Sequence, residues 1–217
     1  MLRLNNPVTD SGVNRENERL ALEAAHLAAI APVTSFHSSD LLVTPFLEGE
    51  QATLGDLAEI GELFSRVHSF DVELSSLDLL QHLESYYEDA SPDPLLTACY
   101  RRVVDLFPEG EVELKPCHID CLLPNIIRAK QGLQLIDWEY AAKADPAYDI
   151  AVFSGTYGLD EGQKELLLAG YGLVGDGFRE RLGYFEVCYG LIEVLWWRLR
   201  GRDMRKELGA LMARLGL

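Results

Sequence analysis

The hydrophobic pattern of the first fifty residues predicts a strand, a helix and a pair of strands. The opening "LRL" has the form of a strand end, and a helical pattern of apolar residues follows at Leu20, Leu22, Ala25, Leu27 and Ile30. Asn14 suits the N-cap of this helix, and Pro32 ends it. Two short apolar runs joined by the turn "HSSD" follow, and Gly49 marks a boundary between two lobes.

The remaining chain is predicted to be helical on either side of a short β region. Apolar residues repeat at helical spacing over 54–70, and two further helices are predicted over 76–89 and 94–107. Between 112 and 137 the pattern changes to short β-like pieces, the last two joined by the turn "KQG". From residue 146 onward the pattern is helical again. This order predicts an α+β fold with two lobes.

Polar residues interrupt the apolar β region in two places. His118, Asp120 and Asn125 stand among core-type side chains in "CHIDCLLPNII", and Asp137 and Glu139 do so in "LIDWEY". Phosphoryl transfer to a hydroxyl needs a carboxylate that orients the hydroxyl and accepts its proton, and oxygen ligands that hold Mg²⁺. The order and spacing of Asp120, Asn125 and Asp137 match the catalytic loop and metal-binding hairpin of protein kinases.

Three blocks of sequence together resemble the choline/ethanolamine kinase and aminoglycoside phosphotransferase superfamily. Its signature is H-x-D-x-x-x-x-N, then an apolar segment ending in D-W/F-E, then D-P-x-x-D-hydrophobic-A. "HIDCLLPN" and "LQLIDWEYAAKADPAYDIA" contain all three blocks in this order. The resemblance implies a protein kinase-like two-lobe fold. It makes residues 1–49 a truncated N-terminal nucleotide-binding lobe with its hinge, and residues 50–217 the catalytic and acceptor-binding lobe.

The same resemblance implies a role for each polar residue of these blocks. Asp120 would be the catalytic base and His118 a support for its loop. Asn125 and Asp137 would be Mg²⁺ ligands, and Glu139 a metal or outer contact. Asp149 would tie down the loop backbone. The alternative from local structure is that Asp120 and Asp149 cap helices. That alternative does not explain why the three blocks occur together.

The N-terminal lobe resembles a nucleotide-binding lobe. "LRLNN" resembles the strand that carries the phosphate-contacting cation, with Arg3 where lysine is more usual. The next helix resembles the one that supplies its acidic partner, with Glu18 the better candidate and Glu16 the alternative, although either is equally explained as a solvated helix charge. ATP and Mg²⁺ are the implied cofactors. "LLVTPFLEG" resembles the connector that holds adenine, through Thr44, Phe46 and Leu47.

The superfamily usually has two strands and a turn before the position of Arg3, and these cover the nucleotide phosphates. The sequence begins just after them. Because positioning and water exclusion contribute much to phosphoryl transfer, a competing hypothesis is a catalytically impaired nucleotide- or ligand-binding pseudo-kinase that lacks the Gly-rich lid.

A late aromatic helix offers candidate acceptor-binding residues. In "GYFEVCYGLIEVLWWRLRG", the residues that can share one side of the helix are Tyr189, Glu193, Trp196 and Trp197. Aromatic faces and a carboxylate hold an organic cation, and the alternative is that these rings are simply core. "LIDWEYA" and "WWRLRGRD" look most like bacterial thiamine kinases and choline kinase-like proteins. The acceptor predicted by this resemblance is a small cationic alcohol of the choline, ethanolamine or thiamine type, with an aminoglycoside as the further alternative.

The composition and charge of the chain limit the classes of partner that it can bind. The 217 residues are 48% hydrophobic, enough for a substantial core, and the formal charge of −16 disfavours nucleic acid. The apolar runs are shorter than the roughly 20 residues of a membrane-spanning helix, so we expect a cytoplasmic protein with no membrane partner. The four cysteines lack CxxC spacing and are expected to be reduced and mostly buried. The sequence does not predict an oligomeric state.

"GYGLVG", residues 170–175, matches the dinucleotide-binding pattern G-x-G-x-x-G. It follows a helical pattern instead of a strand, and no βαβ unit surrounds it. We therefore predict a helix that ends in glycines at this position.

Overall fold

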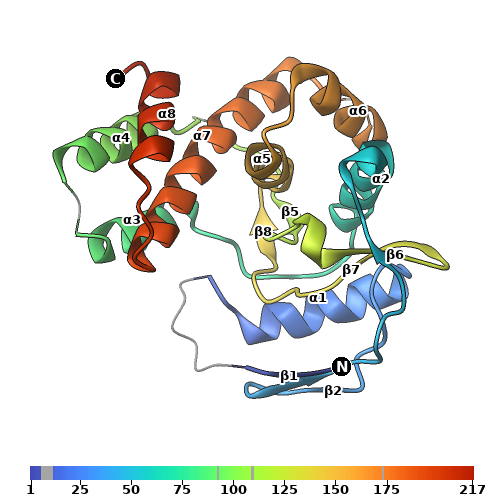
Figure 1. The fold of residues 1–217 in the computed structure, drawn as a ribbon. Helices are drawn as coiled ribbons and strands as arrows, with labels where there is room; N and C mark the ends of the chain where they lie inside the picture. Colours follow the sequence, from blue (N-terminus) through green and yellow to red (C-terminus); the bar gives the residue numbers. More distant parts are fainter. Residues whose placement is uncertain (6–11, 92, 109, 173) are drawn as a thin grey trace.

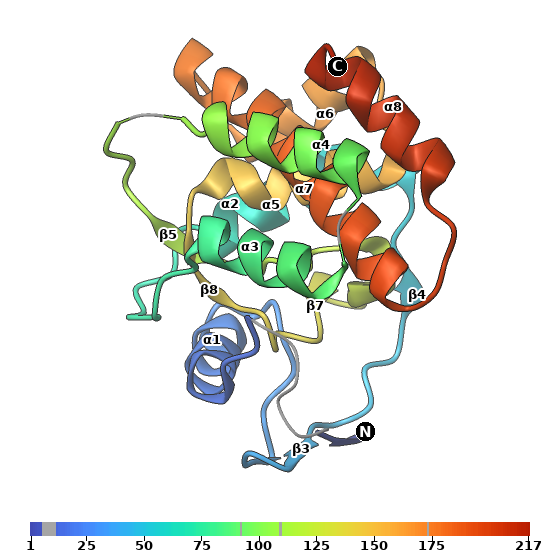
Figure 2. The same ribbon diagram turned by 90° about the vertical axis from the view of Figure 1, so that its left-hand side faces the viewer.

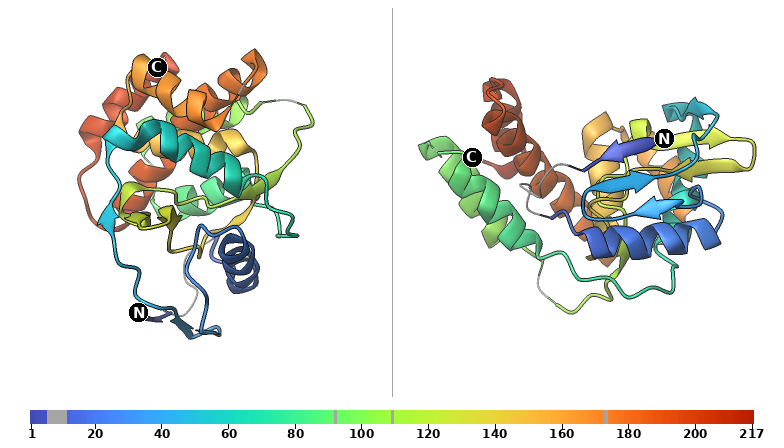
Figure 3. Two further views of the ribbon diagram at one scale, coloured as in Figure 1. Left: turned by 90° about the vertical axis from the view of Figure 1, so that its right-hand side faces the viewer. Right: turned by 90° about the horizontal axis from the view of Figure 1, so that it is seen from below.

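The N-terminal part of the chain is a small sheet that lies along one helix. A computed structural model describes residues 1–5, 12–91, 93–108, 110–172 and 174–217. Strands β1 (Leu2–Leu4), β3 (Leu41–Val43) and β2 (Phe36–His37) form an antiparallel sheet in that order. Helix α1 (Arg15–Leu27) runs beside this sheet, between it and the rest of the molecule (Figures 1 and 3).

Helix α1 begins where the sequence predicts. The side chain of Asn14 accepts hydrogen bonds from the backbone N–H groups of Glu16 and Asn17, which satisfies two of the free donors at the helix start. The buried face of the helix carries Ala21, Leu22 and Ala25 at helical spacing. This apolar stripe is part of the hydrophobic core, and its packing stabilises α1.

Two small sheets bring the predicted catalytic segments together. Strands β4 (Glu50–Gln51), β6 (Ile126–Ala129) and β7 (Gly132–Leu135) form one sheet, and β5 (Lys115–Cys117) pairs with β8 (Ala142–Ala144) in the other. Because Ile126 pairs with Leu135, the residues just outside the β6–β7 hairpin, Asn125 and Ile136, also lie opposite each other. The Ile136 N–H donates to the Asn125 carbonyl at 3.0 Å.

Helices surround this β region and form the larger part of the molecule. Figures 1 and 2 show α3, α4 and α8 gathered on the side away from α2 and α6, with α5 and α7 between. The helices are α2 (Leu57–Val67), α3 (Leu79–Asp89), α4 (Pro94–Asp105), α5 (Pro146–Tyr157), α6 (Glu161–Tyr171), α7 (Asp176–Leu199) and α8 (Arg205–Leu215), with short 3₁₀ turns at Leu54–Asp56 and Leu123–Asn125. The largest fully buried side chains include Trp138, Phe64 and Phe153.

The predicted helices and strands occur close to the expected positions, but β4 and β8 were not predicted. Both are only two or three residues long and exist through pairing with distant strands. Helix α6 ends at Tyr171, Gly172 is its C-cap, and α7 starts at Asp176. The glycine-rich stretch is thus a helix end, as predicted, although residue 173 lies outside the described residues.

The remaining expectations from composition concern cysteines and membrane helices. All four cysteines are buried and free. Among the residues that the structure describes, no helix combines the length and apolar character needed to cross a membrane.

Two glycines allow α2 and α6 to pack in backbone contact. A Cβ on Gly170 would lie 1.9 Å from the Ala58 carbonyl oxygen, and one on Gly61 would lie 2.0 Å from the Leu167 carbonyl oxygen. We expect Gly170→Ala to lower the free energy of unfolding by about 3 kcal/mol, because the helices must separate. Urea unfolding measures this change.

Gly209 provides the control. It lies within α8, and a Cβ there would meet no atom within 4 Å. Gly209→Ala should raise the free energy of unfolding by roughly 0.5 to 1 kcal/mol, because alanine loses less backbone freedom on folding. Equal effects of the two substitutions would contradict the packing argument.

Candidate active site

Asp149 holds the backbone of the 118–120 loop. This residue of α5 is fully buried, and its carboxylate accepts the N–H groups of His118 at 2.8 Å and Ile119 at 2.7 Å. Ile119 has φ of 70°, a conformation that a β-branched residue rarely adopts without support. Asp145, not Asp149, is the N-cap of α5, so helix capping does not account for Asp149.

His68, on which sequence reasoning did not draw, orients this carboxylate. Its Nε2 lies 3.1 Å from Asp149 Oδ2, and its Nδ1 lies 3.0 Å from the hydroxyl of Tyr171. Burial alone raises the pKa of Asp149, but the hydrogen bond and charge of His68 and the N–H of His118 outweigh it, and the pKa is lowered. Asp149 therefore remains an ionised acceptor in the core.

His118 connects the loop to the end of β7. It is fully buried, and its Nε2 lies 3.1 Å from the Ile136 carbonyl, so this nitrogen carries the proton. Its ring meets Trp138 edge to face, with centroids 4.6 Å apart. Burial lowers the pKa of His118. The imidazole thus bridges the loop to the residue after β7 and does not face solvent.

Asp120 and Asn125 are in direct contact. Asn125 Nδ2 donates to the Asp120 carbonyl at 2.9 Å and to Asp120 Oδ2 at 3.0 Å, which leaves the amide oxygen of Asn125 for another partner. Burial, with the nearby charge of Asp137, raises the pKa of Asp120 to about 6. A carboxylate with a pKa near neutrality is well suited to accept a proton.

Asp137 follows β7 and comes directly after Ile136, which is bonded to Asn125 across the hairpin. Its φ of 65° turns the chain out of the strand, and its side chain is 39% exposed. The amide oxygen of Asn125 and the carboxylate of Asp137 are hard oxygen donors of the kind that Mg²⁺ prefers. The residues present thus fit this ion, and Asn125 and Asp137 are the residues that could hold it.

Arg3 joins the small sheet to this segment. Its guanidinium donates to both Glu18 and Asp137, and Glu18 is the acidic partner in the structure. Glu16, the alternative, is exposed and pairs with Arg19. Burial raises the pKa of Glu18, but the bonds from Arg3 and Arg15 prevail and the pKa is lowered. Glu18 also lies 3.2 Å from His37 Nε2.

Glu139, predicted as a metal or outer contact, lies against Arg15. Its Oε2 accepts from Arg15 Nη1 at 3.1 Å, and its carbonyl accepts from the Asn14 N–H at 3.3 Å. Sequence reasoning did not single out Arg15.

The predicted adenine connector is an extended segment after β3. Thr44 is buried, and its backbone N–H and carbonyl are both bonded to Met1. Phe46 is exposed, Leu47 is half-buried, and their backbone groups make no hydrogen bond within the described part of the chain. The backbone of Phe46 and Leu47, and not that of Thr44, is therefore open to a base.

The four predicted acceptor residues differ in their surroundings: burial raises the pKa of Tyr189 and of Glu193, whereas Trp196 and Trp197 stack against arginines. Tyr189 is largely buried, and burial together with the nearby charges of Glu193 and Asp120 raises its pKa to about 12. Burial also raises the pKa of Glu193, which is hydrogen-bonded to Trp197. One face of each tryptophan is already covered by an arginine, with Arg200 3.5 Å from the centroid of Trp196 and Arg202 4.9 Å from that of Trp197.

Tyr157 is a further residue near Asp120 that sequence reasoning missed. Its hydroxyl accepts the Leu123 N–H at 2.9 Å, and burial and the charge of Asp120 contribute to raising its pKa. A tyrosine at the end of α5 has no local signal that distinguishes it from a core residue.

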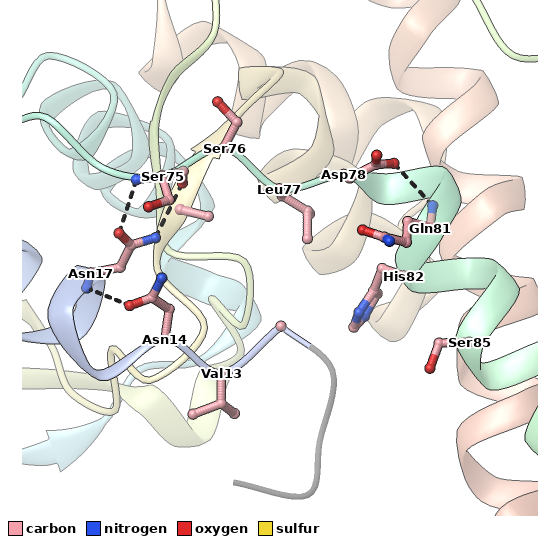
Figure 4. A pocket seen from close by; sticks show the side chains of 12 residues that line it. Val13, Asn14, Asn17, Ser75, Ser76, Leu77, Asp78, Gln81, His82 and Ser85 are labelled. Carbon is pink, nitrogen blue, oxygen red and sulfur yellow. Dashed lines mark hydrogen bonds between the residues drawn. The ribbon is translucent and has the colours of Figure 1, made fainter. Parts of the chain in front are cut away.

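A polar cavity of about 470 Å³ lies between the start of α1 and α3 (Figure 4). On its wall the side-chain amide of Asn17 donates to the Ser75 carbonyl at 3.1 Å and accepts from the Ser75 N–H at 2.9 Å. Asn14, Ser76, Gln81 and Ser85 also line it. None of the site residues predicted from the sequence lines this cavity.

Comparison of the sequence with known proteins gives one family match and a set of relatives. The model of the phosphotransferase enzyme family matches residues 1–184. Thiamine kinase from Escherichia coli strain SMS-3-5 is 33% identical over 128 residues, which cover 57% of this chain and 47% of the relative. The match thus spans about half the length of the curated relatives.

Solved structures show the same fold. A choline/ethanolamine kinase family protein from Mesorhizobium loti superimposes with a TM-score of 0.81 at 22% identity, covering 99% of this chain and 80% of that one. A choline kinase from Streptococcus pneumoniae gives 0.82 at 19% identity, covering 99% and 85%. A complex of the latter kinase with AMP gives 0.74 at 20% identity, covering 94% and 79%. At these identities the likeness establishes the α+β, protein kinase-like fold.

Proposed function

The chain belongs to the phosphotransferase enzyme family, and we propose that it transfers the γ-phosphate of ATP, with Mg²⁺, to a hydroxyl of a small cationic alcohol. The observation that carries the proposal is the meeting of three separate segments. Asp120 and Asn125 are bonded to each other, Asp137 directly follows Ile136, which bonds to Asn125 across the hairpin, and Arg3 bonds to Asp137. Phosphoryl transfer needs these groups in one place.

Each residue has a task that its surroundings support. Asp120, ionised above its pKa of about 6, accepts the proton of the attacking hydroxyl. Asn125 orients Asp120 through its Nδ2, and its oxygen with Asp137 would hold Mg²⁺, which neutralises charge on the phosphate oxygens. Arg3 would contact the phosphates. The backbone of Phe46 and Leu47 would hold adenine.

The acceptor class rests on charge and on the groups near Asp120. The formal charge of −16 favours a cation, and Tyr157, Tyr189 and Glu193 offer aromatic rings and a carboxylate. The rings of Trp196 and Trp197 serve a cation less directly, because Arg200 and Arg202 cover one face of each. Thiamine, choline and ethanolamine are therefore the first acceptors to test. The expected compartment of the protein is the cytoplasm.

A transfer assay with γ-labelled ATP tests the proposal. Thiamine, choline, ethanolamine and an aminoglycoside are offered separately with Mg²⁺, and labelled product is expected with one of the first three. In parallel, a non-hydrolysable ATP analogue with Mg²⁺ at 100-fold its Kd should stabilise the fold by about 2.7 kcal/mol.

The other outcomes are equally informative. Product with the aminoglycoside alone would overturn the acceptor class and favour the antibiotic kinase. Nucleotide binding without transfer to any acceptor would favour the pseudo-kinase. The absence of nucleotide binding would overturn the proposal as a whole.

A further inference from the structure

A second arginine stands beside the Arg3–Glu18 pair. Arg15 opens α1 and donates from one nitrogen, Nη1, to Glu18 at 2.9 Å and to Glu139 at 3.1 Å. Its side chain is 14% exposed. Its Nε is buried and has no hydrogen-bond partner among the described residues. This arginine is therefore held in place by two carboxylates from different parts of the chain.

Arg15 completes a row of charges of alternating sign that begins and ends on one segment. The row runs from Asp137 to Arg3, Glu18, Arg15 and Glu139. Asp137 and Glu139 belong to the segment after β7, whereas Glu18 and Arg15 belong to α1. Helix α1 is thus linked to the predicted metal-binding segment twice, once through each arginine.

The two links differ in what nucleotide binding would do to them. In the proposed function Arg3 contacts the phosphates and Asp137 binds Mg²⁺, so the ion pair between Arg3 and Asp137 would break when nucleotide and metal bind. Glu18 is fully buried, and a buried carboxylate that loses its cation is strongly unfavourable. The carboxylates that Arg15 contacts, Glu18 and Glu139, are other than Asp137, the carboxylate that this function assigns to Mg²⁺.

We propose that Arg15 is a positioning residue that keeps α1 and Glu18 on the 137–139 segment while Arg3 turns from Asp137 to the phosphates. This inference rests on the proposed kinase function. It also assigns the Glu139 side chain to Arg15, so that Asn125 and Asp137 are the protein ligands for Mg²⁺.

A double-mutant cycle of Arg15→Gln and Glu139→Gln tests the assignment. We expect Arg15→Gln to lower kcat by about 10-fold or more, and the double variant to be no slower than Arg15→Gln, because the two residues act through one contact. Arg15→Lys should recover part of the rate, because an ammonium keeps the positive charge but lacks the planar fork of the guanidinium. Arg19→Gln is the control, because Arg19 lies on the same helix but forms its ion pairs among the described residues with exposed Glu16 and Glu23.

Two readouts separate positioning from general loss of structure. Glu139→Gln should leave the Mg²⁺ concentration for half-maximal rate unchanged, whereas Asp137→Asn should raise it. Urea unfolding is also measured without nucleotide and metal. There the losses of unfolding free energy in the two single variants should add up to more than the loss in the double variant.

Additive effects of the two substitutions, or a several-fold higher Mg²⁺ requirement of Glu139→Gln, would overturn the assignment. An inactive wild type would overturn the proposed function instead. The unfolding cycle would then still decide whether Arg15 and Glu139 act as a pair.

Discussion

Replacing Asp120 by asparagine is expected to lower kcat for phosphoryl transfer by about 10²- to 10⁴-fold, the range that general-base assistance contributes. Asparagine keeps the size of the side chain and can still accept the Asn125 Nδ2 hydrogen bond, so the loop geometry should persist. What is lost is the group that takes the hydroxyl proton. Steady-state kinetics with the acceptor identified by the panel measures the effect.

The control variant is Asp105→Asn, an exposed carboxylate at the end of α4. Nucleotide binding, followed by thermal shift, should be retained in both variants. An Asp120→Asn protein that transfers phosphate at the wild-type rate would remove Asp120 from the mechanism, whatever the activity of the control.

The raised pKa of Asp120 also gives the rate and the stability opposite pH dependences. The rate should rise as pH increases through about 6, because the ionised form accepts the proton. Between the ordinary value of 3.8 and about 6, the folded protein holds a proton that the unfolded chain has released, so this group makes stability fall as pH rises through that window. Comparing wild type with Asp120→Asn isolates this contribution from those of other carboxylates.

The second large effect is expected from Asp149→Ala, which should lower the free energy of unfolding by about 3 to 5 kcal/mol. The substitution leaves the N–H groups of His118 and Ile119 buried without an acceptor and His68 Nε2 without its partner. Ile119 would also lose the support for its left-handed backbone. Urea unfolding gives the stability change, and phosphoryl transfer should be lost with the loop geometry.

Asp149→Asn is a milder substitution at the same position, because asparagine keeps the size of the side chain and one acceptor oxygen. Its amide oxygen can accept one loop N–H, but its NH₂ group faces a donor, so an intermediate loss is expected. Asp105→Ala should change stability by less than about 0.5 kcal/mol, as exposed surface substitutions do. If Asp149→Ala were as stable as this control, the loop would not depend on the buried carboxylate.

Local sequence signals were sufficient for the helices, for most of the strands and for the loop that carries Asp120 and Asn125. The helical spacing behind Asn14 and the alternation of helical and β-like segments reflect short-range packing rules, so the predicted elements match the structure closely. Asp120 and Asn125 are five residues apart, and their contact is local. The hairpin that brings Asn125 opposite Ile136 follows from its turn.

Only the tertiary structure decided which charges meet. Arg3 and Asp137 are separated by 134 positions, Arg15 and Glu139 by 124, and His68 and Asp149 by 81. Glu16 and Glu18 are equally acidic in the sequence, but only Glu18 lies on the face of α1 that is turned inward. The arginines that cover Trp196 and Trp197 were likewise not foreseen. Such pairings depend on how helices pack across the whole chain, which spacing along the sequence does not determine.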